Sequence, residues 1–220
     1  MLPFPDHPSL RLLPEGAVWI GEEHALVVAD VHLGKSATFR ARGLPVPEGD
    51  IALDLARLLE LARRWQAQQV IVAGDLFHAP AGFTPELAQA LDEFRNDFGN
   101  ELILVEGNHD RKLKQLPADL RTVQRMRFGC GLEIVHDPED VPLSESLQLA
   151  GHWHPVVRIP DGPHRPMRMP CFVLHQHSLV LPSFGSFTGS SRRQYQPEDR
   201  IFVAHRRNVI EIPRNLISRG

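Results

Sequence analysis

Short apolar runs in the first half of the chain predict buried strands. They span residues 25–29, 70–73 and 102–105, and each ends in polar residues or glycine. A short, largely β-branched run between turn signals is typical of a strand that is buried on both faces. We therefore expect these three runs to lie in the interior of one sheet.

Two longer stretches between these runs predict helices. Residues 51–65 carry apolar side chains at helical spacing, as at Leu55 and Leu58. Thr84 followed by Pro85 predicts a helix N-cap and first helical residue, in a helix that runs to about Phe98. This alternation of strands and helices predicts a sheet with parallel pairs that is covered by helices.

The second half of the chain carries mainly strand signals joined by turn residues. Hairpin connections are predicted at residues 161–163 and 175–177. The fold class predicted for residues 1–220 is one α/β domain with two packed mixed β-sheets flanked by helices. The strand candidates are residues 132–135, 147–150, 170–174, 178–181, 201–204 and 209–212.

Composition and charge narrow the class of protein. The chain has 220 residues, 42% of them hydrophobic and 23% charged, with a formal net charge of −3. This net charge argues against a general nucleic-acid binder, although local basic clusters suit a phosphate-bearing substrate. Two cysteines, no signal-peptide pattern and no apolar run long enough to span a bilayer predict a cytoplasmic protein.

Polar clusters follow four of the predicted strands. Ligands in α/β sheets gather where strands end and loops begin, so we expect these clusters to converge. Residues two apart in a regular strand point to the same side, which predicts that each Asp-x-His or His-x-His pair reaches a common centre. The clusters are Asp30-Val-His32, Gly74-Asp75, Gly107-Asn-His-Asp110 and Gly151-His-Trp-His154.

The residue types in these clusters suit a divalent metal site. Carboxylate, imidazole and amide oxygen bind manganese, iron, zinc or magnesium, and no cluster offers a thiolate. A carboxylate such as Asp75 can bridge two ions. Two such ions would polarise a phosphoryl group and activate a water for in-line attack on phosphorus, without a covalent enzyme intermediate.

In this order the motifs resemble the signature of the calcineurin-like metallophosphoesterases. The resemblance implies a dinuclear phosphoesterase with two divalent ions, Mn²⁺ above all, with Fe, Zn or Mg as alternatives. It implies one ion on Asp30, His32 and His154, a second on Asn108, His136 and His152, and Asp75 between them. It further implies that His109 faces the phosphate as proton donor or charge stabiliser, and that Asp110 orients His109.

Three segments resemble a narrower group, the bacterial ligase-associated phosphoesterases (PdeM). They are Ala29-Asp-Val-His-Leu-Gly-Lys35, Arg168-Met-Pro-Cys-Phe172 and Leu181-Pro-Ser-Phe-Gly-Ser-Phe-Thr-Gly189. The resemblance implies a phosphodiesterase or endonuclease that acts on DNA or nucleotides, with DNA-repair ligase or helicase partners.

Candidate substrate contacts lie around these motifs. Lys35, Arg40 and Arg192 are candidate phosphate contacts, and the segment from Ser183 to Gly189 is either a substrate-side loop or a structural turn. His78 stands where many family members carry a second acidic residue, and it contacts substrate or an outer metal shell, or only its own loop.

Two other functions compete with the phosphodiesterase. A small-molecule phosphoester or pyrophosphate hydrolase would use the same ligands in a closed pocket. A catalytically inactive interaction scaffold would lack some of the ligands or the phosphate-facing histidine, whereas this chain retains the complete set.

Overall fold

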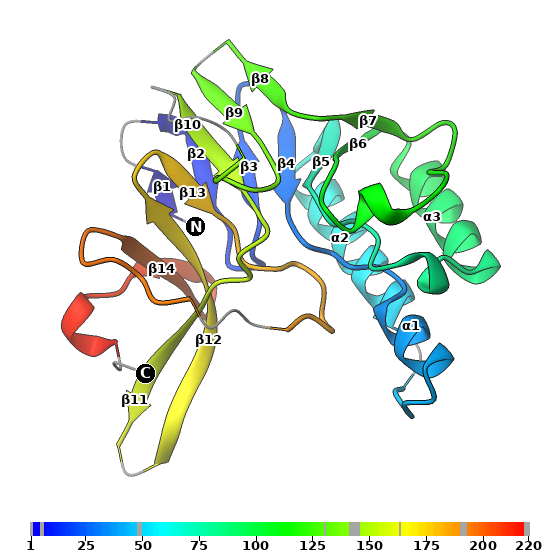
Figure 1. Cartoon of the computed structure of the whole chain (residues 1–220). Coiled ribbons are helices and arrows are strands. Elements are labelled where there is room, and N and C mark those ends of the chain that lie inside the picture. Colours follow the sequence, from blue (N-terminus) through cyan, green and yellow to red (C-terminus); the bar gives the residue numbers. More distant parts are fainter. Residues whose placement is uncertain are drawn as a thin grey trace.

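Two β-sheets pack face to face in the computed structural model (Figure 1). The structure describes residues 2–4, 7–47, 50–129, 131–140, 146–162, 164–189 and 193–217. The first sheet has the order β1-β2-β3-β4-β5-β6-β7. Its strands are β1 (Leu2–Phe4), β2 (His7–Leu12), β3 (Val18–Ile20), β4 (Ala25–Val28), β5 (Gln69–Ala73), β6 (Glu101–Val105) and β7 (Arg121–Val123).

The second sheet has the order β15-β14-β12-β13-β10-β9-β8, and β11 pairs with β12 beside this path. The β11–β12 hairpin extends away from the body of the molecule (Figure 1). The strands are β8 (Met126–Phe128), β9 (Leu132–Ile134), β10 (Leu147–Ala150), β11 (Val156–Asp161), β12 (His164–His175), β13 (Ser178–Val180), β14 (Arg200–His205) and β15 (Asn208–Glu211).

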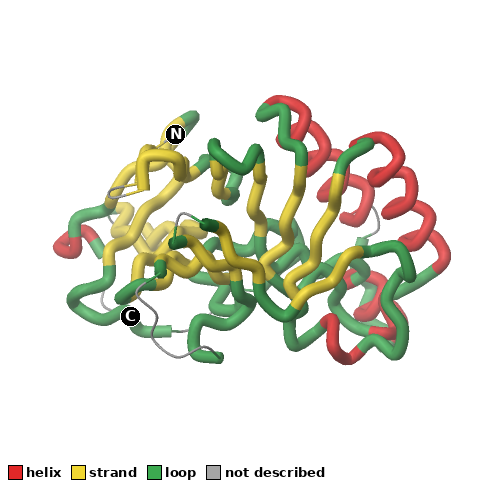
Figure 2. Tube along the Cα trace, turned by 90° about the horizontal axis from the view of Figure 1, so that it is seen from above, coloured by secondary structure: helices red, strands yellow, loops and turns green. Residues whose placement is uncertain are grey.

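Helices cover the outer face of the first sheet. Seen from above, the strands form the middle of the molecule and the long helices lie along one outer side (Figure 2). The helices are α1 (Lys35–Ala41), α2 (Asp50–Arg64) and α3 (Pro85–Phe98), with short 3₁₀ turns η1 (Pro80–Gly82), η2 (Asp110–Lys112) and η3 (Arg214–Leu216). None of the helices in the described ranges is both long and apolar enough to cross a bilayer.

The predicted α/β class with two packed mixed sheets and flanking helices is confirmed, and so are the main elements of the first half. Helix α3 begins as expected, because the Thr84 hydroxyl accepts a hydrogen bond from the Leu87 N–H at 3.3 Å. The sequence patterns missed α1 and the strands β1, β2, β3, β7, β8 and β11, and β12 is longer than expected.

Alternation along β4 explains the two cores. Ala25 and Val27 face the second sheet, whereas Leu26 and Val28 face the helices, and all four are fully buried. Strands β4, β5, β6 and β7 run parallel, as do β9, β10 and β13. Each predicted polar cluster follows the carboxyl end of one of these parallel strands, where loops from both sheets meet.

Candidate metal centre

The loops that carry the polar clusters have an unusual backbone. Nine non-glycine residues in the described ranges have positive φ, and five of these belong to the candidate ligand set: Asp30, His32, Asp75, His152 and His154. Strands β4 and β10 end at Val28 and Ala150, before the Asp-x-His and His-x-His pairs begin. The prediction that these pairs converge because they alternate within a regular strand is therefore wrong. Left-handed residues direct these side chains, a conformation that non-glycine residues adopt at a cost in free energy.

Asp30, His32 and His154 form the first cluster, and their ligand atoms lie within 4.8 Å of one another. His154 Nε2 is 3.1 Å from His32 Nε2 and 3.3 Å from Asp30 Oδ1. The Asp30 carboxylate also accepts the backbone N–H of His152 at 2.9 Å, which ties the loop after β10 to the loop after β4. Asp30 is completely buried. The first implied ligand set is thus assembled from both sheets.

Asn108, His136 and His152 form the second cluster. Asn108 Oδ1 lies 3.0 Å from both His136 Nε2 and His152 Nδ1, and the two ring nitrogens are 3.1 Å apart. The lone histidine of the second half, His136, follows β9 and is buried. The second implied set therefore also converges.

Asp75 lies between the two clusters. Its Oδ2 is 3.9 Å from His32 Nε2, and its Oδ1 is 3.6 Å from His136 Nε2. Burial raises the pKa of this carboxyl above its ordinary value. One carboxylate oxygen faces each cluster, which is the arrangement expected of a residue that bridges two cations.

Backbone carbonyls determine the protonated nitrogen of two candidate ligands. His154 Nδ1 lies 3.3 Å from the Gly189 carbonyl oxygen, and His136 Nδ1 lies 3.2 Å from that of Ala73. Because a carbonyl only accepts hydrogen bonds, each Nδ1 carries a hydrogen, and in the neutral ring Nε2 then keeps a lone pair. Such carbonyl contacts are the usual way in which metal-ligating histidines are oriented.

His152 has an acceptor beside each ring nitrogen. Its Nε2 lies 3.4 Å from Asp137 Oδ2, and its Nδ1 lies 3.0 Å from Asn108 Oδ1. Asn108 Oδ1, His136 Nε2 and His152 Nδ1 thus face one another at 3.0–3.1 Å. A divalent ion among these three atoms would take the place of the hydrogen bonds between them.

The spacing of the donor atoms also fits metal binding. Two ligands that are each about 2.1 Å from one ion, at tetrahedral or octahedral angles, lie about 3.0–3.4 Å apart. The separations within both clusters match this range. Burial, together with the neighbouring His154, lowers the pKa of His32 to about 2, which keeps this ring neutral and able to ligate. The donor set, oxygen with imidazole nitrogen, suits a divalent ion.

Asp110 connects the loops around the centre. Its carboxylate accepts backbone N–H groups from Asp75 at 2.8 Å and from Phe77 and Gly107 at 2.9 Å each. Asp110 is fully buried, and burial raises its pKa to about 6. None of these hydrogen bonds of Asp110 reaches the His109 ring. The family resemblance implied that Asp110 orients His109, and the structure differs from it in this contact.

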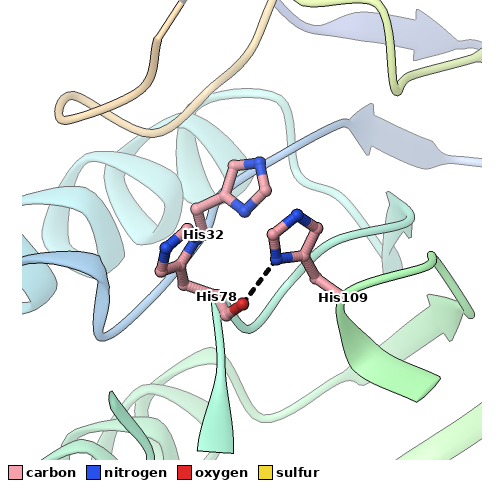
Figure 3. Close-up of side chains that lie close together, drawn as sticks. All are labelled: His32, His78 and His109. Atoms are coloured by element: carbon pink, nitrogen blue, oxygen red, sulfur yellow. Dashed lines mark hydrogen bonds between the residues drawn. The ribbon is translucent and has the colours of Figure 1, made fainter. Parts of the chain in front are cut away.

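The His78 carbonyl contacts the His109 ring instead. His109 Nδ1 lies 2.5 Å from this oxygen, and the rings of His32, His78 and His109 lie close together (Figure 3). The His78 ring stacks on that of His109 at a centroid distance of 5.1 Å. Burial lowers the pKa of His78 to about 4, so this ring is neutral. His109 Nε2 is left to face the centre, 3.9 Å from Asp75 Oδ2.

Two glycines leave space for these side chains. A Cβ on Gly74, which has φ of +83°, would overlap the His136 imidazole. A Cβ on Gly107 would overlap the Asp75 carboxylate. The predicted close approach of backbone to the site is therefore present, and it requires glycine for steric reasons.

The loop from Ser183 to Gly189 supports the first cluster. The buried Asp54 carboxylate on α2 accepts both the backbone N–H of Ser186, at 2.9 Å, and its hydroxyl, at 3.1 Å. The Arg57 guanidinium lies 4.0 Å from the centroid of the Phe184 ring and donates to that residue's carbonyl. This anchored loop carries the Gly189 carbonyl that contacts His154. It is therefore a structural support that also reaches the site.

A cavity of about 410 Å³ opens beside the two clusters. Lys35, one of the candidate phosphate contacts, lines it, whereas Arg40 donates to the carbonyls of Val46 and Pro47 and is not part of the lining. Arg192 lies outside the described residues. The lining residues are Lys35, Asp137, Glu139, His152, Trp153, His154, Gly189 and Arg193.

Sequence reasoning missed Arg193, the second arginine of an Arg-Arg pair that follows the loop. Its guanidinium carbon lies 3.5 Å from the centroid of the Trp153 ring, and its Nη1 lies 2.8 Å from Glu139 Oε1. The Arg-Arg pair was visible in the sequence, but nothing there distinguished which arginine contacts the cavity.

Comparisons with known proteins agree with this geometry. The family model for calcineurin-like phosphoesterases matches residues 24–208. The crystal structure of Pseudomonas putida nuclease MPE superposes with a TM-score of 0.79 at 31% sequence identity, and the match covers 96% of this chain and 99% of that chain. No curated protein shows significant sequence similarity to the chain.

Proposed function

The chain belongs to the calcineurin-like phosphoesterase family and is a metal-dependent phosphoester hydrolase, and from this premise we propose that it is a dinuclear phosphodiesterase that acts on DNA or nucleotides. The observation that supports the dinuclear centre is the convergence of Asn108, His136 and His152, whose ligand atoms lie 3.0–3.1 Å from one another. Asp75 joins this cluster to the one built from Asp30 and His32.

In this proposal each cluster holds one divalent ion, Mn²⁺ above all. Asp30, His32 and His154 would hold the first ion and Asn108, His136 and His152 the second, with Asp75 between them. When bound, two such ions polarise a phosphoryl group and lower the pKa of a water molecule.

His109 would supply the proton chemistry. Because the His78 carbonyl accepts from Nδ1, the ring presents Nε2 to the centre, and in the cationic form Nε2 carries a proton. From this position it can stabilise negative charge on a phosphoryl oxygen or protonate the leaving oxygen. Asp110 would act indirectly, by holding the loops that carry Asp75 and Asn108.

Two observations favour a diester of DNA or a nucleotide over a phosphate monoester of a small metabolite. The structural match is to the Pseudomonas putida nuclease MPE. Lys35 and Arg193 line the cavity next to the candidate ligands, together with the carboxylates of Asp137 and Glu139, and they offer cationic side chains to a polyanionic substrate. A place in DNA repair beside a ligase or helicase is part of this proposal.

Manganese-dependent hydrolysis of bis-p-nitrophenyl phosphate, measured beside the monoester, tests the function. Wild type is compared with Asp75→Asn and with Asp92→Asn, an exposed acidic residue on α3 that serves as the matched control. We expect diester hydrolysis that is lost in Asp75→Asn and unchanged in Asp92→Asn, followed by cleavage of single-stranded DNA. A folded, manganese-loaded protein without activity on either ester or on DNA would instead favour a scaffold.

A further inference from the structure

Arg193 is positioned at the cavity by two neighbours. Its guanidinium stacks over Trp153 at 3.5 Å and pairs with Glu139 at 2.8 Å. Trp153 is buried, with 5% of its surface exposed, and it lies between His152 and His154 in the chain. The ring under Arg193 is therefore fixed relative to the candidate metal ligands on both sides of it.

The ion pair with Glu139 is easily displaced. The Glu139 side chain is 62% exposed and that of Arg193 is 36% exposed. Ion pairs this open to water contribute little to stability because solvent screens them. A terminal phosphate carries more negative charge than a carboxylate, an internal phosphodiester carries the same single charge, and the oxygens of both match the planar donors of a guanidinium. The cation–π contact uses the face of the guanidinium, so donation to an anion such as Glu139 or a phosphate uses its edge.

We propose that Arg193 forms a second phosphate subsite, which binds a phosphate adjoining the scissile one, and that Glu139 occupies it as a displaceable counter-ion in the free protein. This inference rests on the proposed function and specifies its substrate as a chain with more than one phosphate. Arg193 shares one cavity with His152 and His154, so a short segment of nucleic acid can reach both the subsite and the centre.

If the subsite exists, removing the charge of Arg193 and removing the charge of Glu139 should have opposite effects on the affinity for a substrate with a further phosphate. Arg193→Gln removes the phosphate-binding group, whereas Glu139→Gln removes its competitor. Arg158→Gln on β11 and Asp140→Asn, whose carboxylate lies 3.9 Å from Arg111, are the matched controls because each removes the same charge elsewhere. Arg193→Lys keeps the charge but loses the planar donors.

Kinetics on thymidine dinucleotides separate the subsite from the centre. The substrates are TpT, which has only the scissile phosphate, and the same dinucleotide with one further phosphate at the 5′ or the 3′ end. We expect the further phosphate at one end to lower KM in wild type, and Arg193→Gln to raise that KM about tenfold, well beyond any change in the KM for TpT. Glu139→Gln should lower the same KM about two- to threefold. Arg193→Lys should recover part of the loss.

Equilibrium binding provides the readout that does not depend on turnover. Fluorescence anisotropy of a labelled single-stranded DNA 12-mer is measured with the metal-free full chain at fixed salt. Arg193→Gln should weaken binding and Glu139→Gln should strengthen it, with both controls close to wild type. Equal binding by all variants, or equal KM changes on TpT and its phosphorylated forms, overturns the subsite. If Arg193→Gln and Glu139→Gln change DNA affinity as expected but no protein hydrolyses any substrate, the proposed function is refuted and the phosphate subsite is not.

Discussion

Replacing Asp110 by alanine should destabilise the protein by about 3–4 kcal/mol, because three buried backbone donors lose their acceptor. The donors are the N–H groups of Asp75, Phe77 and Gly107, all within 2.9 Å of the carboxylate. Each buried donor left unsatisfied costs about 1–3 kcal/mol. The estimate takes the lower part of the summed range, since water can enter the vacated space and satisfy some of the donors.

Asp110→Asn should cost about half as much. Its amide oxygen can take the place of Oδ2, which accepts from both Asp75 and Gly107, but the amide NH₂ then faces the N–H of Phe77. One donor is lost instead of three, at a cost of about 1–2 kcal/mol. The free energy of unfolding should therefore rise from Asp110→Ala to Asp110→Asn to wild type, because the number of acceptors for the three N–H groups rises in that order.

Urea denaturation followed by tryptophan fluorescence measures these differences. EDTA is present throughout, so that metal affinity does not contribute to the free energy of unfolding. Asp92→Asn, an exposed carboxylate on α3, serves as the control and should stay within about 0.5 kcal/mol of wild type. If Asp110→Ala lies within about 1 kcal/mol of wild type, or if asparagine is the worse substitution, the count of satisfied donors is refuted.

Three further substitutions or reactions test other parts of the structure. Gly74→Ala places a Cβ against the His136 ring at a left-handed position, so it should lower the free energy of unfolding by about 2 kcal/mol or more. It should also weaken manganese binding measured by calorimetry, and an unchanged affinity for manganese would contradict the overlap. Thr84→Ala removes the N-cap of α3 and should lower the free energy of unfolding by about 1 kcal/mol in urea titrations, whereas no change would mean that the cap contributes nothing. Burial raises the pKa of the Cys171 thiol to about 12, so the thiol stays protonated at pH 8 and should not react with Ellman's reagent until the protein is unfolded. The test uses a Cys130→Ser background, in which rapid reaction of the folded protein would show that the Cys171 thiol is accessible.

The buried elements could be predicted because their patterns reflect burial directly. Strands β4, β5 and β6 are apolar on both faces since one face meets the helices and the other meets the second sheet. Helix α3 was predicted to within a residue because Thr84 and Pro85 are local signals that need no tertiary context.

The missed elements lack such local signals. Helix α1 has seven residues, which is too short for a helical period to show. Strand β2, which lies between β1 and β3, contains His7, Ser9 and Arg11, and its sequence shows no clear apolar run because these side chains are partly or fully exposed. Both elements form because β3, β4 and the loop after β4 provide surfaces for them, and that context is absent from a pattern of a few residues.

In the candidate site, too, some features could be predicted from local sequence and others depend on contacts between distant segments. The ligand identities could be listed from motif order, but the reason for their convergence could not. Asp30 and His32 were expected to point the same way as members of a strand, yet both have left-handed backbone beyond the end of β4. Hydrogen bonds between distant loops hold this backbone in place, such as that from the His152 N–H to Asp30. No local pattern encodes such a bond.

The clustering of left-handed residues at the centre is itself an argument for function. A non-glycine residue in this region costs of order 1–3 kcal/mol and persists only where surrounding contacts enforce it. Turn residues such as Gln66 and Gln176 explain some of the positive φ values in the described chain, but Asp30, Asp75 and His154 belong to the groups of side chains that could hold a metal ion. Backbone strain at these residues is unfavourable for the fold alone. A divalent ion held by the same side chains would offset this cost, so metal binding gives a physical reason why the strained backbone is retained.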